Sequence, residues 1–501
     1  MNSKAGNSRR VIAIAMILPA LILLLVQQVI PTVRTLILSL QQVDARDGST
    51  TFVGFDNYTA HLDPEWFSTL LPAIAAGLVP AVAGFLIGHT VGRVLLRVPA
   101  RAHRMGLAVL GIALISIAPL SYYIATFPAA DQPVGIITST TAVWIGAAAV
   151  AGALVGQAST AAGKHTLGLG IAIAAGAGAA LGLQMTTPAM ASPAEVPMSG
   201  VYYGAFGDLA IGPAAAMSTI LLVPVMILGI VLTLLLLGSR LHLRADPYGA
   251  PAGRRLPGVV GLVAAVLVLA AALVLAQPWL MGWFGPSVLD GGSDIVGRTW
   301  LAAGRGVVPT IALSALAGIG IGYFRPFGAR SSAVLLLFSP WLLVSVAPLV
   351  TTHVLDRLEL GLVDLPVGRI YPHLLIIPLL FLFTYLAGAV RRSARPALLP
   401  ALAIAGLASV VLVLLRTQEV LWTRLVATGA DSQSAPVVAL RYLAEGFPGT
   451  GLVSLLSPAP IVLVLAVVCA MAASGARGLH LVRADGGAPP DRATDGGAPR
   501  A

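Results

Sequence analysis

Long apolar runs separated by short polar connections make up most of this chain between Val11 and Ser474. Each run is close to the ~20 residues that an α-helix needs to cross the hydrocarbon core of a bilayer. The pattern predicts an all-α polytopic membrane protein with about twelve transmembrane helices. The expected spans are Val11–Ile30, Ser68–Leu95, Met105–Phe127, Val134–Gly156, Thr166–Met185, Leu209–Leu237, Val259–Phe284, Trp300–Phe324, Ser332–Thr352, Ile370–Val390, Ala397–Leu415 and Leu452–Ser474.

A polar, basic segment at residues 239–257 divides the spans into two sets of six. Its three prolines and its glycines are typical of a linker between domains. We therefore expect one six-helix half at residues 1–238 and a second, pseudo-symmetric half at residues 258–474. The remaining residues 475–501 are rich in Gly, Ala, Pro, Asp and Arg, which predicts a disordered cytoplasmic tail.

Charged residues alternate between the two sets of connections. One set, with both termini, holds 21 of the 30 Lys and Arg residues and 4 of the 20 Asp and Glu residues. The other set holds 9 basic and 16 acidic residues. Because basic loops stay on the cytoplasmic side during insertion, this bias predicts a multi-pass protein of the cell membrane with both termini in the cytoplasm.

The composition excludes several classes of protein. Only 10% of the residues are charged and the mean hydropathy is +0.91, whereas soluble domains carry about 25% charged residues. The net charge of +10 fits the cytoplasmic loops, so we expect membrane lipids and no nucleic acid as partners. Cys469 is the single cysteine, which excludes an intramolecular disulfide and a CxxC pair.

Several stretches carry motifs of one transporter family. Phe52–Tyr58 reads FVGFDNY, Pro31–Ser39 follows the pattern Pro-x-x-x-Thr-Leu-x-x-Ser, and Gly212–Ser218 reads GPAAAMS. Further along lie Ala317–Gly328 (AGIGIGYFRPFG) and Leu358–Pro372 (LELGLVDLPVGRIYP). In this order they resemble segments of the two permease subunits of type I ABC importers for carbohydrates, the maltose-type family. The chain therefore resembles two such permeases fused in one polypeptide.

The resemblance implies a mechanism and a set of partners. In such importers an extracellular solute-binding lipoprotein delivers a sugar or a related polar solute, and cytoplasmic ABC ATPase subunits drive alternating access. The chain contains no Walker A, GxGxxG or GxSxG motif. We therefore expect no cofactor and no enzyme activity in this chain, with ATP bound by a separate subunit.

One feature of the family is missing. Its permeases dock on the ATPase through a cytoplasmic loop of about 20–30 residues with a Glu-Ala-Ala pattern, between the fourth and fifth spans of each permease. Here the corresponding connections are the short segments Gln157–His165 and Arg391–Pro396. The residues left for a coupling surface are Gln157, Lys164, Arg391 and Arg392. The alternative is a non-transporting permease-like membrane subunit with a structural or regulatory role.

A few polar residues in or beside the spans are candidates for the substrate pathway. Gln184, Gln418 and Glu419 could hydrogen-bond hydroxyl groups, and Trp422 could stack on a sugar ring. Arg305, near an end of its span, either extends to the membrane surface or faces the pathway. Arg416 lies three residues before Glu419, so these two side chains could form an ion pair.

A second alternative is a membrane glycosyltransferase, because such enzymes place acidic catalytic residues in an external loop like the one that holds Asp44 and Asp47. Ordinary external carboxylates explain the same two residues. His89, His353 and His373 are scattered along the sequence without an HxxxH spacing, so we expect no metal site.

Overall fold

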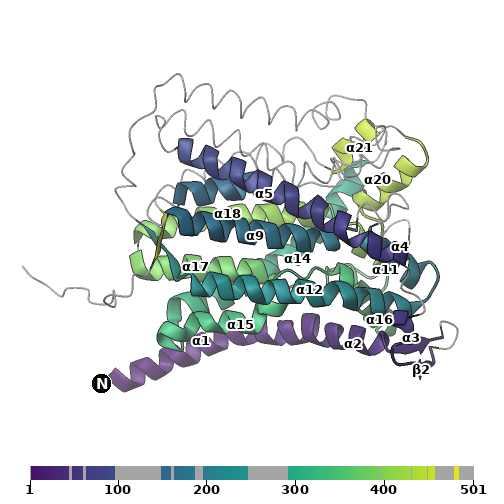
Figure 1. The fold of residues 1–501 in the computed structure, drawn as a ribbon, viewed down its shortest axis with the longest axis horizontal. Helices are drawn as coiled ribbons and strands as arrows, with labels where there is room; N and C mark the ends of the chain where they lie inside the picture. Colours follow the sequence, from purple (N-terminus) through teal and green to yellow (C-terminus); the bar gives the residue numbers. More distant parts are fainter. Residues whose placement is uncertain are drawn as a thin grey trace, which may run out of the picture.

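The computed structural model describes residues 2–44, 48–59, 64–95, 148–158, 163–186, 196–245, 292–393, 395–429, 432–447, 449–456 and 479–483. In these residues the chain is mostly helical, and its strands form two separate two-stranded antiparallel sheets. The long helices lie side by side along one direction and form a bundle (Figure 1).

The elements of the first part of the chain are α1 (Asn2–Leu24), a π-helical turn (Leu25–Val29), α2 (Ile30–Leu38), β1 (Gln41–Val43), β2 (Thr50–Phe52), α3 (Asp56–Thr59), α4 (Pro64–Ser68), α5 (Leu70–Leu95), a helix at Ala148–Ala158, α9 (Gly163–Leu183), α11 (Pro197–Phe206), α12 (Ile211–Gly238) and β3 (Leu241–Ala245). Those of the second part are α14 (Gly292–Ile319), a π-helical turn (Gly320–Phe324), a 3-10 helix (Gly328–Val334), α15 (Leu335–Phe338), two 3-10 turns (Ser339–Trp341 and Ala347–Leu349), α16 (Val350–Glu359), α17 (Ile377–Ser393), α18 (Arg395–Thr417), α19 (Leu421–Val426), α20 (Ala435–Ala444), α21 (Gly449–Leu456) and β4 (Leu479–Arg483).

Six helices of the described residues are long and apolar enough to cross a membrane, so the chain is a membrane-embedded protein. They are Asn7–Leu38, Pro64–Val94, His165–Leu183, Ile211–Gly238, Asp294–Phe324 and Pro396–Thr417. Each of them contains one of the spans expected from the apolar pattern or most of it. The expected spans Met105–Phe127 and Val259–Phe284 lie outside the described residues, as do most of Val134–Gly156 and Leu452–Ser474.

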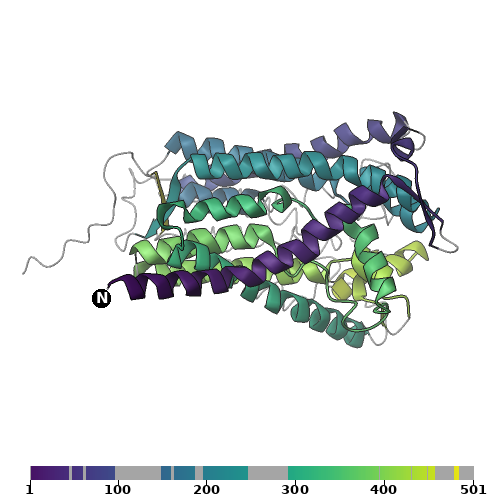
Figure 2. The same ribbon diagram turned by 90° about the horizontal axis from the view of Figure 1, so that it is seen from below.

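The first helix is longer than the apolar pattern predicts. α1, the π-helical turn and α2 follow one another without a break, and the combined helix crosses the bundle diagonally (Figure 2). The π-helical turn ends two residues before Pro31, which has no N–H group to continue the α-helical hydrogen bonds. The helix also extends before Val11 and begins at Asn2.

Small residues set the contact between α5 and α9. A Cβ atom at Gly77 of α5 would overlap the carbonyl group of Gly178, and one at Gly182 would overlap the carbonyl group of Ala73. Without side chains at these positions the two backbones touch, which is how helices associate in lipid, where no hydrophobic effect drives them together. The Gly- and Ala-rich sequence of these helices is therefore explained by packing.

The expected span Ser332–Thr352 is wrong. The structure has a 3-10 helix, the single turn α15 and two further 3-10 turns there, and only the last residues begin α16. Pro340 and Pro348 are each the second residue of one of the 3-10 turns, where the missing N–H group of proline is tolerated. The expected span Ile370–Val390 also begins late, since α17 starts at Ile377, with Pro378 in its first turn.

The two sheets lie at opposite ends of the bundle (Figure 1). β1 and β2 form a hairpin near α2 and α12. At the other end β3 pairs with β4, with Leu241 opposite Arg483 and Ala245 opposite Leu479. β4 belongs to the segment expected to be a disordered tail, so that expectation is wrong for residues 479–483: their alternating apolar residues pair with the start of the linker.

The two ends of the bundle differ in their charges, although the end that carries α16 also holds Arg34 and Arg357. The end that carries β3 and β4, here called the basic end, includes Arg240, Arg244, Arg325, Arg330, Arg391 and Arg392. The end that carries β1, β2 and α16, here called the acidic end, includes Asp56, Glu65, Asp356, Glu359 and Asp364. This separation follows the alternation of the loops along the sequence.

Candidate functional site

A cavity of about 690 Å³ lies between the first and second parts of the chain. One wall comes from α9 and α12. The other comes from the irregular stretch at residues 341–347, from residues 371–381 and from the end of α18. The volume is in the usual range for binding sites of small molecules.

The cavity has an apolar and a polar end. Ile173 and Ala177 of α9, Leu236 of α12 and Phe381 of α17 line the part closer to the basic end. The part closer to the acidic end is lined by Tyr371, His373, Arg416, Gln418 and Glu419. Gln28, Gln184, Thr186 and Ser345 add further polar groups to the lining.

Gln184, a predicted pathway residue, lines this cavity but uses its side chain to hold the wall together. Its Nε2 donates to the carbonyl groups of Ala180 (2.8 Å) and Leu343 (3.0 Å). Its Oε1 accepts from the backbone N–H of Ser345 (2.7 Å). These bonds satisfy the backbone of a non-helical stretch inside the protein.

Two other predicted pathway residues follow the end of α18. The Nε2 of Gln418 donates to the carbonyl group of Leu456 at 3.2 Å. The Oε1 of Glu419 accepts from the backbone N–H of Trp422 at 3.2 Å, at the start of α19. Burial raises the pKa of Glu419, and Arg416 and the N–H groups of Leu421 and Trp422 partly oppose this shift.

Trp422 packs directly behind Glu419 and is 1% exposed, so its ring does not face the cavity. Arg305 lies on an exposed face of α14 and is not among the lining residues. The structure therefore brings three of the five predicted residues to the cavity, places Trp422 next to them and leaves Arg305 apart.

The possible ion pair between Arg416 and Glu419 does not form. The guanidinium group of Arg416 lies over the ring of Tyr371, 3.2 Å from its centroid, and reaches the carbonyl group of His373 at 3.5 Å. No ion pair joins Arg416 to Glu419 in the described structure. The reason is local: α18 ends at Thr417, so the two residues do not share a helical face.

Two histidines that are twenty residues apart in the sequence meet beside the cavity. The rings of His353 and His373 are 5.3 Å apart, and that of Trp422 is 6.4 Å from His353. Both imidazoles are buried, and burial next to Arg357 lowers the pKa of His353 to about 3, so this ring is neutral. Sequence spacing did not predict this pair because it depends on the broken helix at residues 328–349.

Gln28 is a further residue that sequence reasoning missed. It lies in the π-helical turn Leu25–Val29, is 2% exposed and lines the cavity. Its neighbour Gln27 accepts a hydrogen bond from the backbone N–H of Leu374 at 2.8 Å. The sequence contains a feature that could have identified it: two adjacent glutamines in a membrane-spanning run. Polar groups in lipid need partners, so such residues usually face the protein interior.

The predicted coupling residues lie at the basic end. Arg391 donates to the carbonyl group of Tyr323 (2.9 Å), and Arg392 donates to that of Leu243 (3.3 Å). Gln157 is buried near the end of the helix Ala148–Ala158, and Lys164 lies in the first turn of α9. Both arginines therefore link α17 by hydrogen bonds to other segments, Arg391 to the π-helical turn at Tyr323 and Arg392 to β3.

Asp44, one of the two residues of the enzyme alternative, does not line the cavity. Asp44 is exposed at the turn that joins β1 to β2, where its backbone bonds to Ser49 and Gly48. Asp47 lies outside the described residues.

Comparisons of the whole chain with models of protein families, with curated proteins and with solved structures found no match.

Proposed function

We propose that this chain is a transmembrane permease and that the cavity between its two parts is the solute-binding site. The observation that carries the proposal is the cavity itself, whose walls come from both residues 1–238 and residues 258–474. In transporters built from two repeats, the substrate site lies at the interface between them. The polar groups at one end of an otherwise apolar chamber support the same assignment.

The proposal includes twelve spans in two pseudo-symmetric halves, in the cell membrane. The separation of charge between the two ends of the bundle supports an orientation with the basic end in the cytoplasm, and hence with both termini there. The acidic end, with β1, β2, α16 and α20, then faces outward and would receive a solute-binding lipoprotein.

The resemblance to maltose-type permeases supports import of a sugar or a related polar solute, with ATP hydrolysed by separate cytoplasmic ABC subunits. Arg391, Arg392 and Lys164 would lie at the cytoplasmic end in that arrangement, and Gln157 would lie buried beside them.

A second candidate function, a permease-like subunit that does not transport, rests on the connections at the basic end. α17 ends at Ser393 and α18 begins at Arg395, so no coupling helix fits between them. The helix that ends at Ala158 is followed by α9 from Gly163, which leaves a connection of four residues. An ATPase that binds the family's docking helix would lack its binding site in both of these connections.

The test is a purification of the tagged, full-length protein from native membranes in mild detergent, followed by ATPase assay and mass spectrometry of the eluate. Co-elution of an ABC ATPase and a solute-binding lipoprotein supports the importer. An eluate with neither of them contradicts the importer and favours the non-transporting subunit, whose function its other partners would then indicate.

A further inference from the structure

Three segments that are far apart in the sequence meet at the basic end (Figure 1). They are α1, the π-helical turn Gly320–Phe324 and α17, with β3 packed on α17. A Cβ atom at Gly320 would lie 3.0 Å from the carbonyl oxygen of Ala13 in α1, and one at Gly322 would overlap the carbonyl group of Thr384 in α17. The turn is therefore held closely between the two helices.

Arginines stand at the ends of these segments. Arg325 directly follows the turn, and Arg391 and Arg392 lie in the last turn of α17. Arg391 is joined to the turn by its hydrogen bond to the carbonyl group of Tyr323 (2.9 Å). Burial lowers the pKa of Arg392, and the charges of Arg325 and Arg391 lower it further. The three guanidinium groups are thus close enough to repel one another, and arginine stays protonated in proteins.

Two more arginines come from α1, which begins at the end of the bundle where the turn stops. Arg9 and Arg10 are exposed and lie four and three residues before Ala13, so they are on the helix face that packs against the turn. We call Arg9, Arg10, Arg325, Arg391 and Arg392 the arginine cluster. The described helices, turns and strands that meet here contain no Asp or Glu, and the ion pairs of the described residues belong to α2, α16 and α20. No carboxylate of these segments neutralises the cluster.

The backbone at Arg325 indicates that its side chain has a role. Its φ is 51°, in the left-handed region where glycine and asparagine are the usual residues. Glycine would follow the π-helical turn at a lower conformational cost, so the side chain is what the arginine contributes. The preference for basic residues at the cytoplasmic ends of spans explains the sign of the charge. It does not explain an arginine at a position that favours glycine.

Apolar side chains that are exposed on the membrane-spanning surface lie beside the cluster. Ile319 and Tyr323 are 38% and 44% exposed and lie four residues apart on the membrane-spanning helix Asp294–Phe324. Since Arg325 follows the last residue of this helix, the cluster lies at the depth of the lipid headgroups. Ile319 is six residues earlier, about 9 Å deeper along the helix, at the depth of the acyl chains. A ligand that covers both regions has an anionic head and an apolar chain.

We propose that the arginine cluster binds the phosphate of an anionic phospholipid, whose acyl chains lie along Ile319 and Tyr323. The planar guanidinium group offers paired N–H donors that match phosphate oxygens. Basic pockets between transmembrane helices bind lipid headgroups by this chemistry. A zwitterionic phospholipid has the same phosphate, but its ammonium group adds a positive charge to a cluster that lacks carboxylates. The proposal requires only that the chain is embedded in a membrane, so it is independent of whether the chain transports a solute.

The experiment measures which lipid the full-length protein retains. The protein in dodecyl maltoside is mixed with equal amounts of phosphatidylglycerol and phosphatidylcholine that have the same acyl chains. After size-exclusion chromatography the bound lipids are extracted and quantified. Phosphatidylglycerol is expected to be retained at one or more molecules per chain and in several-fold excess over phosphatidylcholine.

Substitutions locate the site. Arg325→Asn, which suits the left-handed backbone, and Arg391→Gln should each lower the preference for phosphatidylglycerol about fivefold. Arg93→Gln is the matched control, because Arg93 is exposed near the end of α5 and its loss removes the same charge from the same end of the bundle. The double variant Arg9→Gln with Arg10→Gln changes only exposed side chains of α1. It should lower the preference too, and it keeps the proposal testable if an α17 variant fails to fold.

Equal retention of the two lipids by the wild type overturns the proposal. So does an equal effect of Arg93→Gln and Arg391→Gln, because the lipid would then respond to the overall charge of this end. Displacement of phosphatidylglycerol by millimolar glycerol 3-phosphate would assign the site to a free phosphate ester and overturn the assignment to a lipid. Unchanged lipid retention, together with loss of a co-eluting ATPase in the cluster variants, would assign the cluster to a protein partner and overturn it as well.

Discussion

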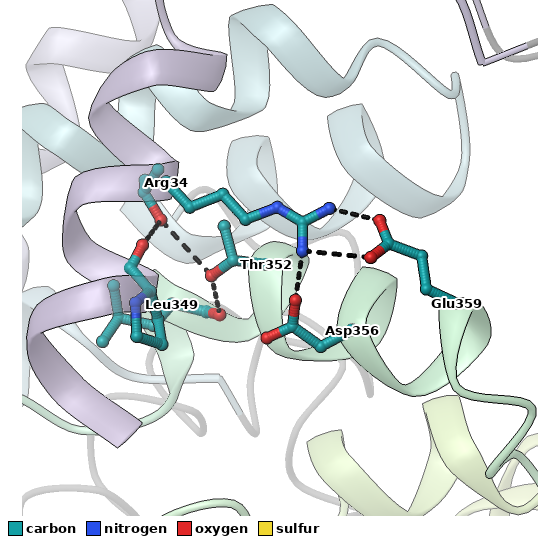
Figure 3. Close-up of polar contacts among 7 residues, drawn as sticks. Arg34, Leu349, Thr352, Asp356 and Glu359 are labelled. Atoms are coloured by element: carbon teal, nitrogen blue, oxygen red, sulfur yellow. Dashed lines mark hydrogen bonds and ion pairs between the residues drawn. The ribbon is translucent and has the colours of Figure 1, made fainter. Parts of the chain in front are cut away.

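Arg34 on α2 and Asp356 on α16 form an ion pair although 322 residues separate them in the sequence (Figure 3). The same guanidinium group pairs with Glu359, on the next turn of α16. Beside them the hydroxyl groups of Thr35 and Thr352 are 3.4 Å apart. These contacts join the first and second parts of the chain at the acidic end, where neither part has another charged link of this kind in the described residues.

The first prediction concerns the strength of this link. Arg34→Gln and Asp356→Asn should each lower the free energy of unfolding, and the double variant should lose less than the sum. We expect a coupling energy of about 1 kcal/mol, because both side chains are partly exposed and water screens the pair. Thermal unfolding in one detergent measures all the variants. Arg305→Gln, combined with Asp356→Asn, should be additive, and additivity for Arg34 would contradict the prediction.

The second prediction concerns the contact between α14 and α17. A Cβ atom at Gly318 would lie 2.5 Å from the Cβ of Phe383, so Gly318→Ala should destabilise the protein by about 1–3 kcal/mol. Gly304, on the same helix, has nothing within 4 Å of its Cβ position. Gly304→Ala should therefore be neutral or slightly stabilising. Equal melting temperatures for the two variants would show that this helix contact is not tight.

The third prediction tests Gln184 as part of the wall. Gln184→Met keeps the volume but leaves the N–H of Ser345 and the carbonyl group of Leu343 without their partner. The expected loss is about 1–3 kcal/mol of unfolding free energy. Gln42→Met, on an exposed strand position, should change the stability by less than about 0.5 kcal/mol. If the Gln184→Met protein were as stable as the wild type, these hydrogen bonds would not hold the wall, and a role of Gln184 in ligand binding would be favoured instead.

The fourth prediction is a pH dependence at Asp364. Its carboxylate accepts from the N–H and hydroxyl groups of Thr428 (2.7 and 2.6 Å), the hydroxyl group of Ser432 (2.8 Å) and the N–H of Gly429 (3.0 Å). These bonds, that of the Thr428 hydroxyl first, lower the pKa of Asp364 below its ordinary value of 3.8. A lowered folded-state pKa stabilises the protein above the unfolded-state pKa, and this contribution is lost as the pH falls through the folded-state value.

The wild type should therefore lose more stability than Asp364→Asn between about pH 5 and pH 2. Asparagine is a suitable replacement because Asp364 has a φ of 63°, a conformation that asparagine tolerates. Thermal unfolding across this pH range gives the comparison. Parallel stability curves would contradict the prediction, because they would mean that the carboxyl group of Asp364 has the same pKa in the folded and unfolded states.

The sequence predicted those helices whose position depends only on the apolar composition of their own segment. α5, α9, α12 and α18 begin and end close to the expected boundaries, because an unbroken apolar run has one stable form in a bilayer. The stretch Ser332–Thr352 is also apolar but forms 3-10 turns, and its prolines alone do not explain this, because Pro80 lies inside α5 and Pro224 inside α12. In this chain, hydropathy therefore predicts where apolar segments lie, but it does not predict whether each segment forms one continuous helix.

The candidate site was predictable only in part, and for a related reason. Gln184, Gln418 and Glu419 were selected as polar residues at the ends of apolar runs, and the fold brings them to one cavity. Gln28 and His373 were not selected, because their place depends on a π-helical turn and on a non-helical entry to α17. Such irregular backbone is set by contacts between distant segments, as with Gln27 and Leu374.

The strand pair β3–β4 has a consequence for how the two parts of the chain are held together. β3 directly follows the last helix of the first part, and β4 belongs to the end of the chain, so five residue pairs join the two parts independently of the covalent linker. If the polypeptide were cut within residues 246–291 and produced as two fragments, each fragment would still carry one strand of this sheet. The backbone pairing of β3 with β4 would then hold the two fragments together without the covalent linker.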